Sequence, residues 1–224
     1  PVDQSTITKR YADEGINFIK KSVREKKPFF LYLANSMPHT PLYASPEFKG
    51  KSKRGLYGDV IEEIDYNTGR IMDLLKELGV DDNTIIIFTS DNGPWLAKGD
   101  DSGSALPLFE GKFSSFEGGM RVPFIVRWPE EIPAGSTCTE PAATIDILPT
   151  LAGIAGAKLP DAELDGKTIL DLWQGTYRIV VSRYVEYTIR YDIVIHSQSF
   201  DQIPNPPAAE KNVDKEAHNN LYHS

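Results

Sequence analysis

The sequence predicts an α/β fold with a mostly parallel sheet, and three observations carry that prediction. Short apolar runs typical of buried strands stand at residues 29–33, 85–89 and 122–128. Segments with apolar residues at helical spacing alternate with these runs along the chain. Strands that are apolar throughout need cover on both faces, which intervening helices provide. With 224 residues and 40% hydrophobic content, the chain can bury a core of this kind.

The N-terminal part supplies two helices and one strand. Apolar residues recur at helical spacing over residues 12–23, after a possible N-cap at Thr8. The run FFLYL at 29–33 is expected as a short strand. A longer helix is expected over residues 61–78, and Gly79 suits its C′ position, where a left-handed backbone often ends a helix.

The remaining elements of the α/β unit are two strands and one helix. The run IIIFT at 85–89 has the composition of a strand buried on both faces, and residues 122–128 form the next apolar run. A final helix is expected over residues 146–155. Its inward positions would be Ile147, Leu151 and Ile154, which share one face at helical spacing.

The C-terminal part changes character. Alternating apolar residues predict strands between 177 and 195, and a Pro-containing polar stretch follows. We therefore divide the chain into an α/β unit at 1–175, a small β-rich segment at 176–200 and a polar tail at 201–224.

Charge and composition restrict the partners. A formal net charge of −8 argues against nucleic acid or an anionic membrane surface as a partner. No apolar stretch reaches the roughly twenty residues of a membrane span. An anionic substrate would meet a repulsive overall field, so it would need a concentrated local positive charge. The single cysteine, Cys138, cannot form an intramolecular disulfide.

Polar residues at the ends of strands are the candidate site, because ligands of open α/β sheets bind outside the carboxyl ends of strands. Asp91 and Asn92 follow the strand 85–89 and offer hard oxygen donors suited to Ca²⁺ or Mg²⁺. Two such donors cannot complete a site that needs six or more. The same residues, in the run DNGP, also suit an ordinary turn.

Two further residues could bind an anion. His39 follows the strand at 29–33 and lies between Pro38 and Pro41, which stiffen its loop, although a lone histidine is more often structural. Lys112 lies between Gly111 and Phe113. A lysine there is ordinarily a solvated charge, but in the same cleft as Asp91 it would hold a tetrahedral oxyanion.

Several runs together resemble the C-terminal half of the arylsulfatase-type sulfatases. In chain order they are PFFLYLANSMPHTPL, GLYGDVIEEIDYNTGRIMDLLKELG, TIIIFTSDNGPW, EGKFSSFEGGMRVPFIVRWP and TIDILPTLAGIAGAKLPDAELDGKTI. Each run is a weak signal alone, but five in this order are specific. The resemblance covers about residues 5–175.

The resemblance implies an alkaline-phosphatase-like α/β sandwich that hydrolyses a sulfate ester. Asp91 and Asn92 match the family's ligands of one Ca²⁺ ion. Lys112 matches the lysine that binds sulfate oxygens, and His39 matches the histidine near the leaving oxygen. The partner would be a sulfated small molecule or glycan. The family also suggests a periplasmic, secreted or lysosomal location, and the oligomeric state is not indicated.

The sequence departs from the family pattern at the nucleophile. The family uses a formylglycine made from the cysteine of a C-x-P-S-R motif, and Cys138 stands in GSTCTEPA, which lacks that context. We therefore expect this chain to be an incomplete sulfatase domain that is inactive by itself, with the nucleophile in a missing N-terminal part. Two alternatives stay open: a phosphatase or phosphodiesterase of the same superfamily, and a non-catalytic fragment or pseudoenzyme that binds a sulfated ligand.

Overall fold

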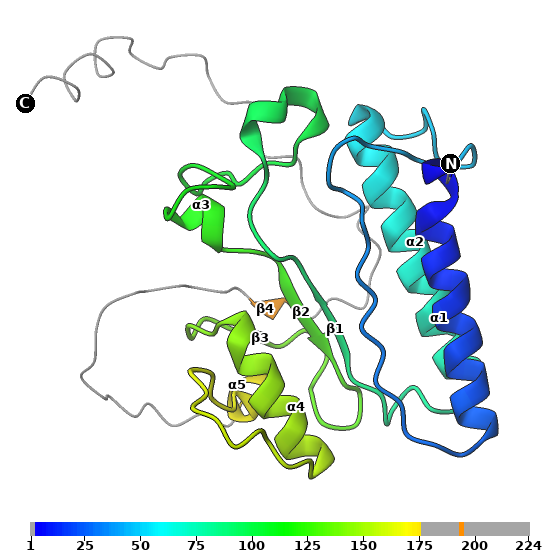
Figure 1. Ribbon diagram of the computed structural model, residues 1–224, viewed down its shortest axis with the longest axis vertical. Helices are drawn as coiled ribbons and strands as arrows, with labels where there is room; N and C mark the ends of the chain where they lie inside the picture. Colours follow the sequence, from blue (N-terminus) through cyan, green and yellow to red (C-terminus); the bar gives the residue numbers. More distant parts are fainter. Residues whose placement is uncertain (1–2, 176–192, 195–224) are drawn as a thin grey trace, which may run out of the picture.

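The computed structural model describes residues 3–175 and 193–194 (Figure 1). Helices, short 3-10 turns and strands alternate in the following order: η1 (Gln4–Thr6), α1 (Ile7–Arg24), α2 (Gly55–Glu77), β1 (Ile86–Thr89), η2 (Leu96–Asp101), α3 (Glu117–Met120), β2 (Phe124–Arg127), β3 (Thr137–Cys138), η3 (Thr144–Asp146), α4 (Ile147–Ala155), α5 (Leu170–Gln174) and β4 (Ile193–Val194).

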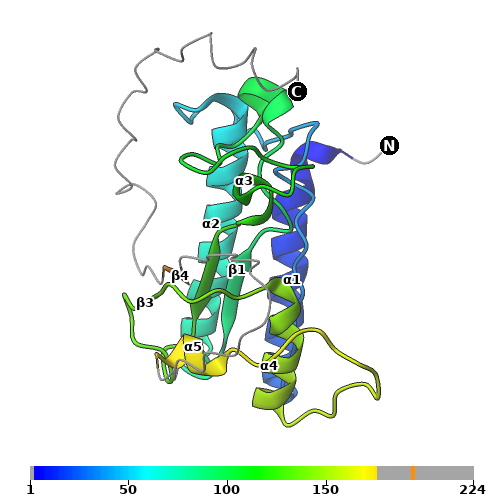
Figure 2. The same ribbon diagram turned by 90° about the vertical axis from the view of Figure 1, so that its left-hand side faces the viewer.

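Helices cover both faces of the sheet. The long helices α1 and α2 lie side by side on one face, and α4 and α5 lie on the other (Figures 1 and 2). The side chains of β1 alternate between the two cores, because successive residues of a strand point to opposite faces. Ile86 packs against the α1 and α2 side, whereas Ile85 and Ile87 pack into the cluster that contains Val126 and Trp173. The predicted three-layer α/β arrangement is therefore present.

The strand β1 and its neighbour β2 run antiparallel, with Thr89 opposite Phe124 and Ile86 opposite Arg127. The sheet order is β1-β2-β4-β3, in which β2 and β4 are parallel and β3 and β4 are antiparallel. The prediction of a mostly parallel sheet is thus wrong for the strands that the structure describes. The reason is the loop 90–123, which leaves the carboxyl end of β1 and enters β2 at the same end of the sheet. A parallel pair would need a crossover element that carries the chain back to the other end of the sheet before the next strand begins.

Residues 29–33 form no strand, which corrects a second prediction. Phe29 and Leu31 are half-buried and pack against α1 and α2, whereas Phe30 and Tyr32 are exposed. Between residues 28 and 35 the backbone makes no hydrogen bond to other described backbone groups. An apolar alternating pattern is not enough for a strand, because a strand needs a neighbour that accepts its backbone hydrogen bonds.

The three predicted helices are present as α1, α2 and α4, but two N-termini differ, since α2 begins at Gly55 and not at residue 61. Thr8 is not an N-cap, since it is buried inside α1, whose first residue is Ile7. Gly79 follows the C-terminus of α2 with φ 68°, as its C′ position requires. Ile147, Leu151 and Ile154 of α4 pack against the core, as expected. Cys138 is a buried core residue.

The predicted segments 176–200 and 201–224 lie outside the described residues, apart from β4. Within the described part, no helix combines the length and the apolar character that crossing a membrane requires.

Candidate active site

The carboxyl end of β1 carries the acid and amide. Asp91 is exposed and Asn92 is half-buried, two and three residues after the strand ends. The side-chain nitrogen of Asn92 donates to the carbonyl of Gly93 at 2.8 Å, which fixes the amide so that the Oδ1 atom faces away from that contact. Ser90 Oγ donates to the backbone carbonyl of Asn92 at 3.1 Å. The turn thus presents carboxylate and amide oxygens at the sheet edge.

Close backbone packing holds the loop 90–123 on that edge. Gly93 N donates to Gly119 O at 2.9 Å, and Gly118 N donates to Phe109 O at 2.8 Å. A Cβ atom on Gly93 would collide with the carbonyl oxygen of Gly118, and one on Gly118 would collide with that of Glu110. Glycine is therefore required at these positions for close approach of two backbone segments.

Lys112 is held by the same packing. Its backbone N–H donates to the carbonyl of Pro94 at 2.8 Å, so the lysine loop is bonded directly to the segment that follows Asp91 and Asn92. The side chain is half-buried, with Nζ 5.5 Å from the ring centroid of Trp95. Arg121 forms an ion pair with Glu117 at 2.9 Å and stabilises the loop further along.

His39 belongs to a second loop, which α2 anchors through two buried carboxylates. Glu63 accepts from the backbone N–H of Ser45 at 2.8 Å, and it is 1% exposed. Asp59 accepts from the backbone N–H groups of Gly50, Lys51 and Ser52 at 2.7, 3.1 and 2.8 Å. The carboxylates of Asp59 and Glu63 therefore hold the loop 37–52 against α2.

Apolar residues of the same loop add to this anchorage. Met37, Leu42 and Ala44 are buried against Val60 and Ile64 of α2. Met37 and Leu42, two residues before and three residues after His39, therefore belong to a packed cluster, while His39 itself is exposed.

Asp59 owes its charge state to opposing effects. Burial acts to raise the pKa of its carboxyl, but the hydrogen bonds from Gly50, Ser52 and Lys51 together outweigh burial, and the pKa lies below its ordinary value. The carboxylate is thus ionised at neutral pH.

The ring of His39 has a defined tautomer. Nδ1 lies 2.7 Å from the carbonyl oxygen of Thr40. Because a carbonyl oxygen only accepts hydrogen bonds, Nδ1 carries the proton. Nε2 is then the atom that accepts a proton in the neutral ring and donates one in the imidazolium.

Trp95 joins the two loops. The centroid of its ring lies 5.9 Å from the centroid of the His39 ring. The Nζ atom of Lys112 lies 5.5 Å from the same Trp95 centroid. His39 and Lys112 are therefore gathered around one indole, and the backbone bonds described above link that indole to Asp91 and Asn92. The structure describes both Asp91 and Lys112, and their side chains form no ion pair with each other.

Asp91 and Asn92 are of the type that binds a hard divalent cation, but two residues are too few to complete its coordination. Asp91 and Asn92 supply oxygen donors, which Ca²⁺ prefers. The described residues contain no cluster of three or more His, Cys, Asp or Glu side chains that could hold a metal ion. The pair can accordingly supply part of a Ca²⁺ site, whose six to eight ligands would include others.

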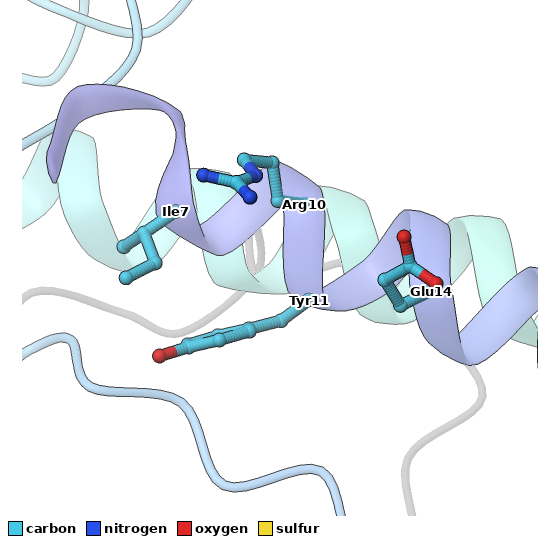
Figure 3. Close-up of a pocket in the computed structure, with 4 residues that line it drawn as sticks. All are labelled: Ile7, Arg10, Tyr11 and Glu14. Carbon is cyan, nitrogen blue, oxygen red and sulfur yellow. The ribbon is translucent and has the colours of Figure 1, made fainter. Parts of the chain in front are cut away.

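A surface pocket lies elsewhere. It has a volume of about 270 Å³ beside the first turns of α1, where Ile7, Arg10, Tyr11 and Glu14 line it (Figure 3). None of the predicted site residues lines this pocket, whose four lining residues all belong to α1. We do not assign it to the site.

Sequence reasoning missed Trp95, Asp59 and Glu63. Trp95 follows directly after the run DNGP, and that adjacency is the signal for it. Asp59 and Glu63 are four residues apart on a helix whose neighbouring residues Val60 and Ile64 are apolar and buried. Two acids on the inward face of a helix indicate backbone donors opposite them.

Comparison with known proteins defines the class. The solved structure of the PsFucS1 sulfatase from Pseudoalteromonas sp. matches with a TM-score of 0.74 at 35% identity, covering 80% of this chain and 38% of that one. The fold is of the alkaline-phosphatase-like α/β class, with the candidate residues at one edge of the sheet.

The sequence comparisons are more specific. A family model described as Sulfatase matches residues 3–157. The steryl-sulfatase of Homo sapiens is 40% identical over 181 residues, which are 78% of this chain and 31% of that protein. The N-acetylgalactosamine-6-sulfatase of Sus scrofa is 43% identical over 169 residues, or 75% of this chain and 32% of that protein. The chain belongs to the sulfatase family and spans about a third of the length of these curated relatives.

Proposed function

We propose that this chain supplies the sulfate-binding and cation-binding part of a sulfuric ester hydrolase, which releases inorganic sulfate from a sulfate ester. The observation that carries the proposal is the placement of His39 and Lys112 around Trp95, next to the turn that holds Asp91 and Asn92. Family membership supports the reaction class, since the described relatives are named as sulfatases.

Lys112 would bind the equatorial oxygens of the sulfate group. Its ammonium is a compact charge that suits a tetrahedral anion, and it lies 5.5 Å from the ring centroid of Trp95. The local positive charge would offset the repulsion that the formal net charge of −8 imposes on an anion.

His39 would protonate the departing alkoxide. Because Nδ1 already donates to the carbonyl of Thr40, Nε2 would carry the proton that is transferred in the imidazolium form. The bond to Thr40 orients the ring at the same time.

Asp91 and Asn92 would hold the Ca²⁺ ion by carboxylate and amide oxygens. When bound, this ion would polarise the sulfate oxygens and offset the charge of the nucleophile. The nucleophile would be a formylglycine that the residues of this chain do not provide, since Cys138 is buried in the core and stands outside a C-x-P-S-R motif.

Sulfate binding to the 224-residue chain tests the proposal. We expect inorganic sulfate to bind in the presence of Ca²⁺, and Lys112→Ala and His39→Ala each to raise Kd about tenfold, because each removes a charge-assisted contact. Isothermal titration measures this, with Lys53→Ala as a matched control at an exposed lysine outside the site. Unchanged affinity in both variants defeats the assignment, and preference for phosphate over sulfate favours the phosphatase alternative.

Turnover gives a second test. The 224-residue chain should release no sulfate from an aryl sulfate, since its one cysteine is not in a C-x-P-S-R motif. Calcium-dependent release above background would contradict the proposed division of labour. In the gene, we expect the codons upstream of Pro1 to encode a C-x-P-S-R or S-x-P-S-R segment after a strand with two aspartates. A clean start codon at that point would favour the non-catalytic alternative.

A further inference from the structure

Tyr57 lies between the two loops that carry the candidate site. It belongs to the first turn of α2, and its half-buried side chain packs on the apolar cluster that contains Met37 of the loop 37–52. The outer end of the same side chain reaches the loop 90–123. A Cβ atom placed on Gly103 would lie 2.5 Å from the Oη atom of Tyr57 and 3.1 Å from its Cζ atom. One phenol ring therefore contacts both sides of the site.

The contact at Gly103 is next to the backbone that holds Lys112. The side chain of Pro94 is the next neighbour of the same Cβ position, at 3.5 Å. The carbonyl oxygen of Pro94 accepts the backbone N–H of Lys112 at 2.8 Å. The turn η2, between Pro94 and Gly103, lies beside the N-terminal end of α2 and contacts it (Figures 1 and 2). A displacement of the Tyr57 ring would therefore act on the part of the loop to which Lys112 is bonded.

Packing links the two loops. Among the described residues, no backbone hydrogen bond joins the loop 37–52 to the loop 90–123. The rings of His39 and Trp95 meet across the two loops, with centroids 5.9 Å apart. Because no such bond fixes the separation of the loops, it depends on the side chains that fill the space between them. Tyr57 is such a side chain.

The phenol of Tyr57 acts by volume and not by charge. Burial raises the pKa of this phenol, and the smaller effect of the Arg54 guanidinium, which lowers it, does not offset burial. The side chain is therefore neutral at neutral pH. Its influence on the two loops is consequently the space that its ring and hydroxyl group occupy.

Gly103 provides the space for the end of this ring. Its backbone does not have a positive φ, so alanine could adopt the same conformation. The obstacle to a larger side chain is the contact with Tyr57, since the next neighbour, Pro94, would lie at an ordinary contact distance of 3.5 Å. The fit between Gly103 and Tyr57 can therefore be tested from either side.

We infer that Tyr57 is a positioning residue, whose ring sets the separation between His39 on the loop 37–52 and Lys112 on the loop 90–123. The inference rests on the proposed function, which gives His39 and Lys112 their roles. A set of binding groups must be held within about 0.5 Å of its productive geometry. Tyr57 acts on sulfate binding through these two residues.

Proton NMR and sulfate titration of the 224-residue chain test the inference. The ring current of Trp95 shifts the ring protons of His39, which His39→Ala assigns, and Trp95→Leu gives their position without the indole. We expect Tyr57→Ala to lose this ring-current shift and to raise Kd for inorganic sulfate in the presence of Ca²⁺ about fivefold, because the separation of the loops is no longer fixed. Tyr57→Phe keeps the ring and should retain both values.

Ile7→Ala is the matched control for lost packing. Ile7 packs on the same apolar cluster from α1, and it is not among the atoms nearest to Gly103. Ile7→Ala should lower the urea midpoint of unfolding as Tyr57→Ala does, because both remove apolar contacts from one cluster. It should leave the His39 shift and the Kd for sulfate unchanged.

Gly103→Ala disturbs the same contact from the other loop and leaves the apolar cluster intact. Its methyl group would meet the Tyr57 hydroxyl group and displace the ring, so we expect part of the His39 shift to be lost. Adding Tyr57→Phe removes that hydroxyl group and should restore the shift, which a double-mutant cycle records as coupling. Gly153→Ala, in α4 with open space around the position, is the control and should leave the shift unchanged.

Three results overturn the positioning by Tyr57. The first is an unchanged His39 shift in both Tyr57→Ala and Gly103→Ala, and the second is an equal loss of the shift in Ile7→Ala. The third is a lost shift in Tyr57→Ala with an unchanged Kd for sulfate. If Tyr57→Ala does not fold, the cycle with Gly103→Ala decides: coupling supports the positioning, and its absence overturns it.

The proposed function fails on a different measurement. If Lys112→Ala and His39→Ala leave the Kd for sulfate unchanged, the proposed function is overturned. A His39 shift that is lost in Tyr57→Ala and kept in Tyr57→Phe then still supports the control of the loop separation by the Tyr57 ring.

Discussion

The two loops that carry the candidate site are held by different kinds of interaction. The loop 37–52, which contains His39, is held by two carboxylates of α2 that accept its backbone hydrogen bonds. Its apolar residues also pack in the cluster that contains Val60. The loop 90–123, with Lys112, is held by backbone-to-backbone bonds that glycines permit. No charged side chain of α2 is needed for those bonds.

This difference predicts opposite sensitivities. The His39 loop should respond to the charge of the acids beneath it and therefore to pH. The Lys112 loop should respond to the volume of single side chains, because two backbone segments are in contact there with no space between them. The geometry of the candidate site would then be disturbed by a change of pH at the His39 loop and by added side-chain volume at the Lys112 loop.

The largest expected effect is steric. Gly118→Ala should lower the free energy of unfolding by about 3 kcal/mol, because its Cβ atom would meet the carbonyl oxygens of Phe109 and Glu110. Urea unfolding followed by circular dichroism measures the change. Gly69→Ala, in the middle of α2 with open space around it, is the control and should be stabilising by up to about 1 kcal/mol. Equal effects of the two substitutions would remove the distinction between the loops.

A smaller effect is expected at the acid beneath the His39 loop. Asp59→Asn should lower the free energy of unfolding by about 2 kcal/mol, because the amide replaces one acceptor oxygen with a donor that faces backbone N–H groups. Glu62→Gln, at an exposed position of α2, is the control and should change little. If Asp59→Asn were as stable as the parent, the carboxylate would not be the anchor of this loop.

The smallest effect concerns pH. The pKa of Asp59 is lowered in the folded state, so its ionised form stabilises the fold fully above the unfolded pKa, near 4. That contribution is lost as the pH falls from about 4 through the folded pKa. The gap in stability between the parent and Asp59→Asn should therefore be constant near neutrality and should shrink in acid. Unfolding curves at pH 7 and pH 3 measure it, and a gap that widens in acid would contradict the assignment.

Much of the candidate site followed from local sequence. Asp91 and Asn92 stand where an apolar strand ends, and the strand is at the predicted position. The helix α2 and its closing Gly79 followed from spacing and from the need for a left-handed residue. These features depend on neighbours within a few residues, for which the sequence contains the information.

The amino-acid sequence by itself determined the α/β class, the positions of the main helices and the residues at the strand end. Only the tertiary structure decided that residues 29–33 pair with no strand among the described residues, that β1 and β2 run antiparallel, and that the ring of Trp95 lies near both His39 and Lys112. The physical reason is distance along the chain. Spacing and propensity act over one or two turns, whereas strand pairing and the meeting of two loops are set by which separated surfaces pack together.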